Sequence, residues 1–341
     1  MGDQPGCACA LRVEHVVTLS DVDGRAGLSR HLVIERVPGG HYLVVPVRRQ
    51  DAVLVFDSAG RFLRNAGRSG AGPGEFASVQ AIRRGRGDTT VVMDSGNGRL
   101  AYLDAELRTV RTANLPVLGG WFGVLGDGRV VVMTGFGMRR SEPLDRLRLL
   151  SPTLEPIRSF MQVGPSRPES DVADLRRRMA VSPDGIIALG HNNRYVVEIW
   201  DASGTHLRTL SRDPDWFAPP SPGRPGGGAA EPAPRLETPR FDGRGRLWTL
   251  SHVADANWRD ALAPTKDVYG REVVTVRTGR QSDHLDTIVE VLDPKTGRLL
   301  AGLRIDAAVD LISDDGFAAS YREDEVGQPS IDIWRFTLVG D

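Results

Sequence analysis

Short apolar runs alternate with turn-forming residues along almost the whole chain. A run of apolar residues followed by a tight-turn group recurs five times, and a looser sixth copy lies near the end. The copies are Val55-Phe56-Asp57, Tyr102-Leu103-Asp104, Leu149-Leu150-Ser151, Ile199-Trp200-Asp201, Val291-Leu292-Asp293 and Ile333-Trp334-Arg335. Successive copies are 47, 47, 50, 92 and 42 residues apart. Self-similarity at such a period predicts a repeat architecture.

A second signature precedes each of these copies: a turn rich in Gly and Asp, followed by a run rich in Val and Ile. The turns lie at residues 38–40, 85–88, 126–128, 183–185, 242–245 and 314–316. Gly and Asp tolerate the backbone conformations that hairpin turns need, and Val and Ile favour strands. Each repeat therefore predicts four antiparallel strands, which is typical of one blade of a β-propeller.

The repeats predict an all-β fold, a six-bladed β-propeller with four-stranded antiparallel blades. The predicted blades span residues 31–65, 79–113, 121–163, 179–211, 238–305 and 309–339. The last blade shows only three strand signals, whereas residues 12–19 form an unassigned strand ahead of the first blade. We expect this N-terminal strand to complete the last blade and close the ring, since closure protects exposed strand edges. Residues 1–11 are predicted to be a flexible tail, and 12–341 a single domain.

Two insertions interrupt the repeats. Residues 213–237 are rich in Pro and Gly and are expected to lack regular structure. Residues 254–283 separate the second and third strands of the fifth blade and include a short helix predicted over 258–262. Both insertions are expected on one face as a lid anchored by Trp216, Phe217 and Trp258.

Two segments in the first third of the chain carry a family resemblance. The linker Gly67-Arg-Ser-Gly-Ala-Gly-Pro-Gly-Glu-Phe76 follows a hairpin at 57–62, and residues 91–100 are Val-Val-Met-Asp-Ser-Gly-Asn-Gly-Arg-Leu. Both resemble elements of bacterial six-bladed propellers related to NHL-repeat proteins. The resemblance implies that the loops between second and third strands gather on one face, over the central channel. A WD40 propeller is the alternative, on the single pair Trp200-Asp201.

Composition narrows the function and the setting. The 341 residues carry 43 Lys+Arg and 44 Asp+Glu, so the chain lacks the basic excess of a general nucleic-acid binder. No apolar run is long enough for a transmembrane helix. We expect a monomer in the periplasm or outside the cell, with a lipid anchor conceivable in the precursor, because residues 1–10 resemble a trimmed N-terminus. A cytoplasmic protein is the alternative.

Arginine and histidine side chains gather in the loops that the resemblance places over the channel. The candidate ligand-binding residues are Arg48, Arg139, His191, Arg194, His252 and Arg322. Guanidinium groups can hold a carboxylate or phosphate with two parallel hydrogen bonds, and a histidine can orient a carbonyl. A small anionic ligand is therefore the expected partner, with a protein partner as the alternative. Against this site, Glu323, Asp324 and Glu325 could neutralise the arginines as surface ion pairs.

Metal and catalytic signals are weak. Asp94, Asn97, Asn193 and Asp324 offer oxygen ligands for Ca²⁺, the ion that six-bladed lactonases and related hydrolases hold at the channel with carboxylates and asparagines. Asp94 and Asn97 also match a structural element of the family, in which they can bond the loop backbone. Zinc binding by His191 and His252 lacks support from any closely spaced histidine pair, and no Gly-x-Ser-x-Gly motif is present. The sequence therefore predicts no cofactor, with Ca²⁺ as the alternative.

The sequence favours a ligand-binding or protein-interaction module with its site at the channel mouth. A metal-dependent propeller hydrolase, lactonase or lyase is one alternative, and an accessory subunit of a membrane-attached assembly is another. Whether the protein is an enzyme stays open at this point, because the motifs define no catalytic group.

Overall fold

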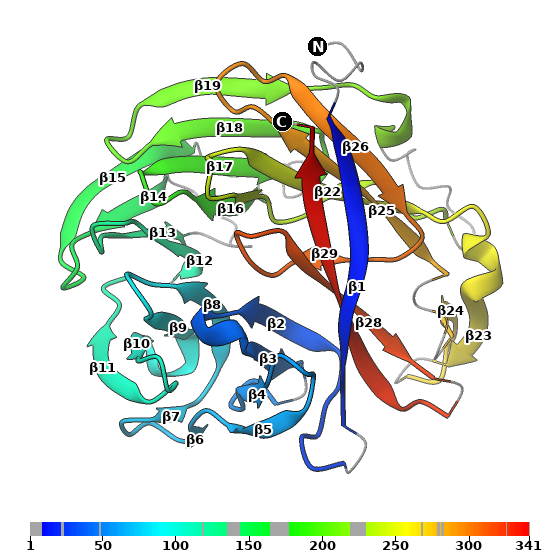
Figure 1. Ribbon diagram of the computed structural model, residues 1–341, viewed down its shortest axis with the longest axis horizontal. Helices are drawn as coiled ribbons and strands as arrows, with labels where there is room; N and C mark the ends of the chain where they lie inside the picture. The colour runs from blue at the N-terminus through cyan, green and yellow to red at the C-terminus, as the bar shows by residue number, and fades with distance from the viewer. Residues whose placement is uncertain are drawn as a thin grey trace.

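Six antiparallel sheets surround a central channel in the computed structural model (Figure 1). The structure describes residues 9–21, 24–47, 49–117, 119–134, 144–163, 177–218, 230–266, 269–277, 280, 283–324 and 326–340. Each sheet is one blade, with its strands in sequence order from the channel outward, except in the last blade. The predicted six-bladed propeller is thereby confirmed.

The first three blades have four strands each. Blade 1 consists of β2 (His31–Arg36), β3 (Tyr42–Pro46), β4 (Leu54–Phe56) and β5 (Phe62–Asn65). Blade 2 consists of β8 (Val79–Arg84), β9 (Thr90–Asp94), β10 (Arg99–Leu103) and β11 (Thr109–Asn114). Blade 3 consists of β12 (Gly119–Val124), β13 (Val130–Thr134), β14 (Leu144–Leu150) and β15 (Pro156–Val163). The linker after blade 1 forms a small parallel pair, β6 (Arg68–Ser69) and β7 (Glu75–Phe76).

The other blades depart from the regular pattern. Blade 4 consists of β16 (Arg177–Val181), β17 (Ile186–His191), β18 (Val196–Asp201) and β19 (His206–Ser211). Blade 5 has a divided inner strand, β20 (Arg235–Leu236) and β21 (Arg240–Phe241), then β22 (Leu247–Ala254), β25 (Leu285–Leu292) and β26 (Leu299–Ile305). Blade 6 consists of β27 (Asp310–Leu311), β28 (Phe317–Glu323), β29 (Pro329–Val339) and β1 (Ala10–Ser20).

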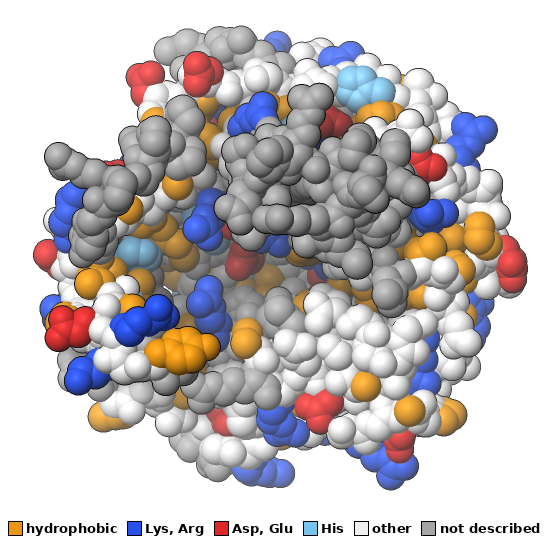
Figure 2. All heavy atoms as spheres, turned by 180° about the vertical axis from the view of Figure 1, so that it is seen from behind, with side chains coloured by type: hydrophobic (Ala, Val, Ile, Leu, Met, Phe, Trp, Pro, Cys, Tyr) orange, Lys and Arg blue, Asp and Glu red, His pale blue; other side chains and the backbone are white. Residues whose placement is uncertain are grey.

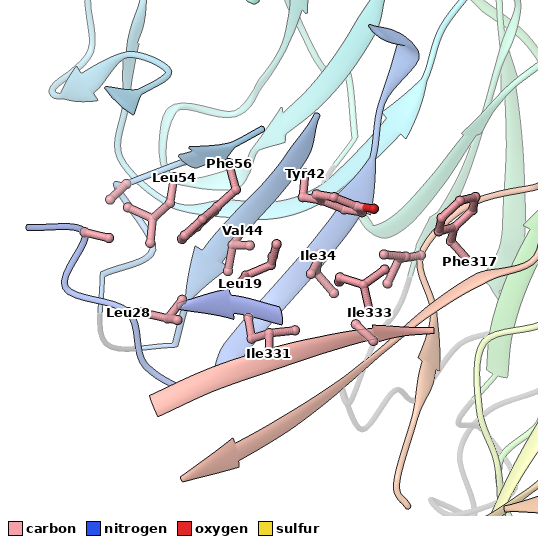
Figure 3. Packing of buried hydrophobic residues seen from close by; sticks show 14 residues of the cluster. Leu19, Leu28, Ile34, Tyr42, Val44, Leu54, Phe56, Phe317, Ile331 and Ile333 are labelled. Carbon is pink, nitrogen blue, oxygen red and sulfur yellow. The ribbon is translucent and has the colours of Figure 1, made fainter. Parts of the chain in front are cut away.

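The N-terminal strand closes the ring as predicted. β1 pairs antiparallel with β29, from Leu11 opposite Leu338 to Leu19 opposite Ile331. Leu19 is fully buried and joins Ile34, Phe56 and Ile331 in the core between blades 6 and 1 (Figure 3). The two ends of the chain are therefore held in the same sheet by backbone hydrogen bonds and apolar packing.

The propeller has two different faces. The turn face carries the tight turns after the inner strands, at residues 38–41, 85–89, 126–129, 183–185, 242–246 and 314–316. The loop face carries the connections between second and third strands, such as residues 95–98 and 192–195. Residues that lead into the inner strands also lie on the loop face, because those strands run from the loop face to the turn face.

The described parts of the two insertions contain more regular structure than the sequence suggests, and residues 219–229 lie outside the described residues. Residues 213–237 were expected to lack regular structure, which is wrong at both ends: η4 (Asp215–Phe217) packs its aromatic rings against Tyr195, and β20 joins blade 5. The helix predicted over 258–262 is a 3-10 turn, η5 (Trp258–Ala261), followed by the hairpin β23 (Leu262–Lys266) and β24 (Glu272–Val276). Trp216 is partly buried, whereas Phe217 and Trp258 are buried, so all three anchor their insertions.

Candidate functional site

A cavity of about 180 Å³ lies in the channel on the side of the loop face. The innermost segments of all six blades line it, with Ile34, Gln80, Trp121, Arg178, Glu237 and Asp310 as one residue from each. In Figure 2 the face shown is hollowed near its middle, and acidic and basic side chains are visible in the hollow. We call this cavity the channel-mouth cavity.

An arginine, a tryptophan and a glutamate from neighbouring blades meet in this cavity. The Arg178 guanidinium lies 5.0 Å from the centre of the Trp121 ring, within the range of a cation–π interaction. A terminal nitrogen of Arg178 also lies 3.3 Å from a carboxylate oxygen of Glu237. Burial by itself raises the pKa of Glu237, but its contact with His252 and the nearby positive charges lower it below the ordinary value. Glu237 is therefore a carboxylate at neutral pH.

A buried ion-pair network closes the cavity toward the turn face. Arg240 bonds the Glu35 carboxylate at 2.8 and 3.2 Å, and Arg83 approaches the same carboxylate at 3.4 Å. Arg83 and Arg240 also line a smaller cavity of about 90 Å³ on the other side of the network. Burial and the charge of Arg240 lower the pKa of Arg83 to about 10. The network thus separates the channel into two compartments and gives the channel-mouth cavity a charged floor.

His252 connects this cavity to blade 6. Its Nε2 lies 2.9 Å from the carbonyl oxygen of Val309, and its Nδ1 lies 3.6 Å from Glu237. Burial by itself lowers the pKa of His252, but the interactions with Glu237 and Asp310 raise it to about 9. His252 is therefore positively charged at neutral pH, and its Nε2–H donates a hydrogen bond to the Val309 carbonyl oxygen.

The structure brings together two of the four predicted residues that it describes. His252 and Arg322 line one cavity of about 400 Å³ between blades 5 and 6 on the loop face. Arg322 forms an ion pair with Asp332 at 2.6 Å. His191 lies 2.7 Å from Glu198 and lines neither this cavity nor the channel-mouth cavity. Arg194 follows β17 without lining either one. Arg48 and Arg139 lie outside the described residues.

The predicted metal ligands fall into structural roles at two positions. Asp94 is fully buried and accepts hydrogen bonds from Ala77 N, Ser78 N and the Asn97 side chain. Asp324 accepts the backbone N–H groups of Val326 and Gln328 within a turn. Asn193 belongs to the loop after β17, apart from both.

Another group of carboxylates has the donor chemistry for a cation. Asp255, Asp286 and Asp306 lie at the loop-face end of blade 5, with one oxygen of each within 4.8 Å of the others. Arg304 already contacts Asp286 at 2.6 Å. These three residues do not include any of the predicted metal ligands.

Trp121, Arg178 and Glu237 were not among the predicted site residues, because the predicted site consists of loop residues and these three belong to the innermost segments of the blades. A signal was nevertheless present. Arg83 follows Ala81-Ile82 and Arg178 precedes Met179-Ala180-Val181, both near the start of a blade, and Arg240 precedes Phe241 at the start of blade 5. A strand buried on both faces rarely carries an arginine without a partner, so these charges mark side chains that face the channel.

Comparisons with known proteins define the fold. Residues 33–123 match a family model described as a 6-bladed beta-propeller, DUF5128. The chain is thus a six-bladed β-propeller, which is the fold that the family resemblance implied. No curated protein matches the chain in sequence.

Solved structures of similar fold share little sequence with it. A member of the DUF4221 family from Bacteroides vulgatus aligns with 9% identity and a TM-score of 0.60, over 97% of this chain and 99% of that one. A "putative exported protein" from Bacteroides fragilis aligns with 10% identity and a TM-score of 0.54, over 98% of each chain. In the part of the chain that the structure describes, no helix has the length and apolarity to cross a bilayer.

Proposed function

We propose that this propeller binds a small anionic ligand in the channel-mouth cavity. The observation that carries the proposal is the setting of Arg178. Its side chain is 31% exposed and lies on Trp121, whereas Arg83 and Arg240 in the same channel are 13% and 10% exposed and bound to Glu35. Of these three arginines, Arg178 is thus the one with N–H donors available for a ligand in the channel-mouth cavity.

The chemistry of recognition follows from this arrangement. A guanidinium has five N–H donors, and the contact with Glu237 uses one edge of it at 3.3 Å. The remaining donors fit a carboxylate or phosphate, and the Trp121 ring offers a flat apolar surface beside them. Glu237 would orient the arginine and favour ligands that also carry a hydrogen-bond donor.

The test is a thermal-shift screen of small carboxylates and phosphates against the wild-type protein and Arg178→Ala. We expect ligands that raise the melting temperature of the wild type to lose that effect in the variant. Arg108→Ala, which removes an exposed arginine paired with Asp104, is the matched control and should respond like the wild type. Ligands that stabilise all three proteins equally would place binding elsewhere.

A protein-interaction module is the second candidate, favoured by apolar side chains on the outer surface. Leu63, Val110 and Ile157 are 45%, 61% and 52% exposed, at equivalent positions of blades 1 to 3. If these three side chains contact a protein partner, a complex that forms with the wild type should not form with Val110→Asp/Ile157→Asp. Val13→Asp/Val16→Asp, which changes two exposed valines of β1, should retain it.

The proposal includes a setting in the periplasm or outside the cell as a monomer. The similar structure from Bacteroides fragilis is described as exported, which supports this part of the proposal. Fractionation of the native organism, with detection of the protein in each compartment, tests it. Recovery in the cytoplasm alone would contradict it.

A further inference from the structure

Three blades are tied to their successors by equivalent arginines. In blades 1, 2 and 3 the fourth strand has a one-residue bulge where it pairs with the third strand. The residue that follows this bulge is Arg64 in blade 1, Arg111 in blade 2 and Arg158 in blade 3. Arg64 donates to the carbonyl of Glu106 at 2.5 Å, and Arg111 donates to that of Pro152 at 2.6 Å. Arg158 donates to the carbonyl of Ser203. Each acceptor lies in the turn between the third and fourth strands of the next blade, on the turn face.

Blade 4 has the equivalent arginine but not the bond. Arg208 stands opposite Ile199 after the same bulge, 50 residues beyond Arg158. Among the described residues, its exposed side chain makes no hydrogen bond or ion pair, whereas the three bridging arginines all reach a carbonyl. At the interface between blades 4 and 5, the equivalent arginine is therefore present, but within the described residues it makes no hydrogen bond to the next blade.

The turn in blade 5 explains the missing bond. In blades 2 and 4 the turn is closed by Asp104 N to Arg108 O and by Asp201 N to Thr205 O, four residues apart. In blade 5 it is closed by Asp293 N to Arg298 O, five residues apart. The extra residue changes the path of the turn that Arg208 faces, and it introduces Lys295 beside the groove.

A groove of about 380 Å³ opens at this interface. We call it the 4/5 groove; it is lined by Ser182, Asp184, Ile186, Ile199, Leu207, Arg208, Phe241, Arg244, Gly245, Pro294 and Lys295. Ile199 and Phe241 are buried side chains of the core between the two blades, and Leu207 is 46% exposed. Leu207 thus gives the groove an exposed apolar side chain, and the buried Ile199 and Phe241 form its apolar base.

The charge of the 4/5 groove is positive. Arg208, Arg244 and Lys295 line it against a single acidic residue, Asp184, whose carboxylate accepts a hydrogen bond from Ser182 at 2.6 Å. The whole chain, in contrast, has a net charge of −1, so this excess is local. An apolar base with cations at its rim is complementary to a molecule with an apolar body and an anionic head.

We propose that the 4/5 groove binds a small amphipathic anion, a compound with an apolar body and one carboxylate. The body contacts Leu207, Ile199 and Phe241. The carboxylate takes from Arg208 the hydrogen bond that a backbone carbonyl accepts from the equivalent arginine in blades 1 to 3. This site lies on the turn face, between blades 4 and 5, and shares no lining residue with the channel-mouth cavity.

Octanoate is the probe, and octylammonium, with the same chain and the opposite charge, is its counterpart. Isothermal titration of the wild type should detect octanoate binding and much weaker octylammonium binding. Arg208→Glu/Lys295→Glu should weaken octanoate by about tenfold or more, because it reverses two rim charges. Both residues are exposed, so the variant should keep the wild-type melting temperature and circular dichroism.

Arg12→Glu/Arg86→Glu is the matched control, since it makes the same change in net charge at two exposed arginines outside the groove. It should bind octanoate like the wild type. Leu207→Ser tests the exposed apolar side chain and should weaken octanoate but leave acetate unaffected. Absence of octanoate binding, equal binding of the two probes, or equal loss in the control would overturn the proposal. Arg178→Ala should bind octanoate normally, which separates this site from the channel-mouth cavity.

Discussion

Arg240 and Glu35 are 205 residues apart in the sequence, yet their side chains form a buried bond of 2.8 Å in the channel. Arg240 begins β21 in blade 5, and Glu35 lies in β2 of blade 1. Blade 6 stands between these two blades in the ring. The ion pair therefore links blades 5 and 1, which are not neighbours in the ring. It stabilises the closed propeller in addition to the pairing of β1 with β29.

Breaking this pair should destabilise the fold strongly. Arg240→Met leaves the Glu35 carboxylate buried beside Arg83 alone, and we expect it to lower the free energy of unfolding by about 3–5 kcal/mol. Glu35→Leu/Arg83→Met/Arg240→Met removes all three charges of the network and should cost much less. Chemical denaturation of the wild type and the two variants measures the difference. Equal losses in the single and triple variants would show that packing, rather than the unpaired charge, dominates.

His252 should make stability depend on pH in the alkaline range. Its folded pKa of about 9 lies above the ordinary value of about 6.5, so its protonation stabilises the fold. This contribution is fully present below about pH 6.5 and is lost as the pH rises through 9. We expect the wild type to lose on the order of 2 kcal/mol over that interval, relative to His252→Gln.

Denaturation at a series of pH values from 6 to 10 tests this prediction. The control is His206→Gln, because His206 is exposed and its contacts are with Thr209 and Trp200 of its own blade. It should follow the wild-type curve. A His252→Gln curve parallel to the wild type would mean that another group carries the pH dependence.

The closing strand should be essential for stability. Leu19→Ala opens a cavity in the core between blades 6 and 1, and a cost of about 2–5 kcal/mol is expected for a fully buried leucine. Val16→Ala, at a β1 valine that is 40% exposed, should change stability little. Deletion of residues 1–20 should lower the melting temperature more than Leu19→Ala does. A deletion variant that melts like the wild type would refute the role of β1.

The bridging arginines should differ from Arg208 in their effect on stability. Arg111→Ala removes a hydrogen bond to blade 3 and a cation–π contact of 4.2 Å with Tyr102, and should cost about 0.5–1 kcal/mol. Arg208→Ala removes no such bond and should be nearly neutral. Differential scanning calorimetry on both variants measures this. A larger loss of stability for Arg208→Ala than for Arg111→Ala would mean that Arg208 makes a stabilising contact with the next blade.

The sequence predicted the blades well because each one is a local unit. Turn residues such as Gly185, which has a positive φ, must occur where a hairpin reverses, and β-branched runs must occur where strands are buried. The strand at 12–19 was also predictable, since a blade with three strand signals has an edge that needs a partner. These features depend on neighbours along the chain or on a count of strands.

The site depended on information that the sequence does not hold. The family resemblance predicted a site made of loop residues such as His191, but the partner of His191 is Glu198 in its own blade. Trp121, Arg178 and Glu237 lie in three different blades, and which side chains face the channel is set by strand register and bulges. Spacing along the chain cannot reveal that convergence.

The sequence by itself determined the number of blades, their boundaries and the closing strand, because hydrophobic alternation and turn chemistry act over a few residues. Only the tertiary structure decided which charges are neutralised and which remain available. Arg158 and Arg208 are equivalent in the sequence repeat. Arg158 donates a hydrogen bond to the carbonyl of Ser203 in the next blade, but the turn of blade 5 is one residue longer and offers Arg208 no equivalent bond. A hydrogen bond depends on angstrom-scale placement of groups far apart in the chain, and that placement is fixed only when the blades pack.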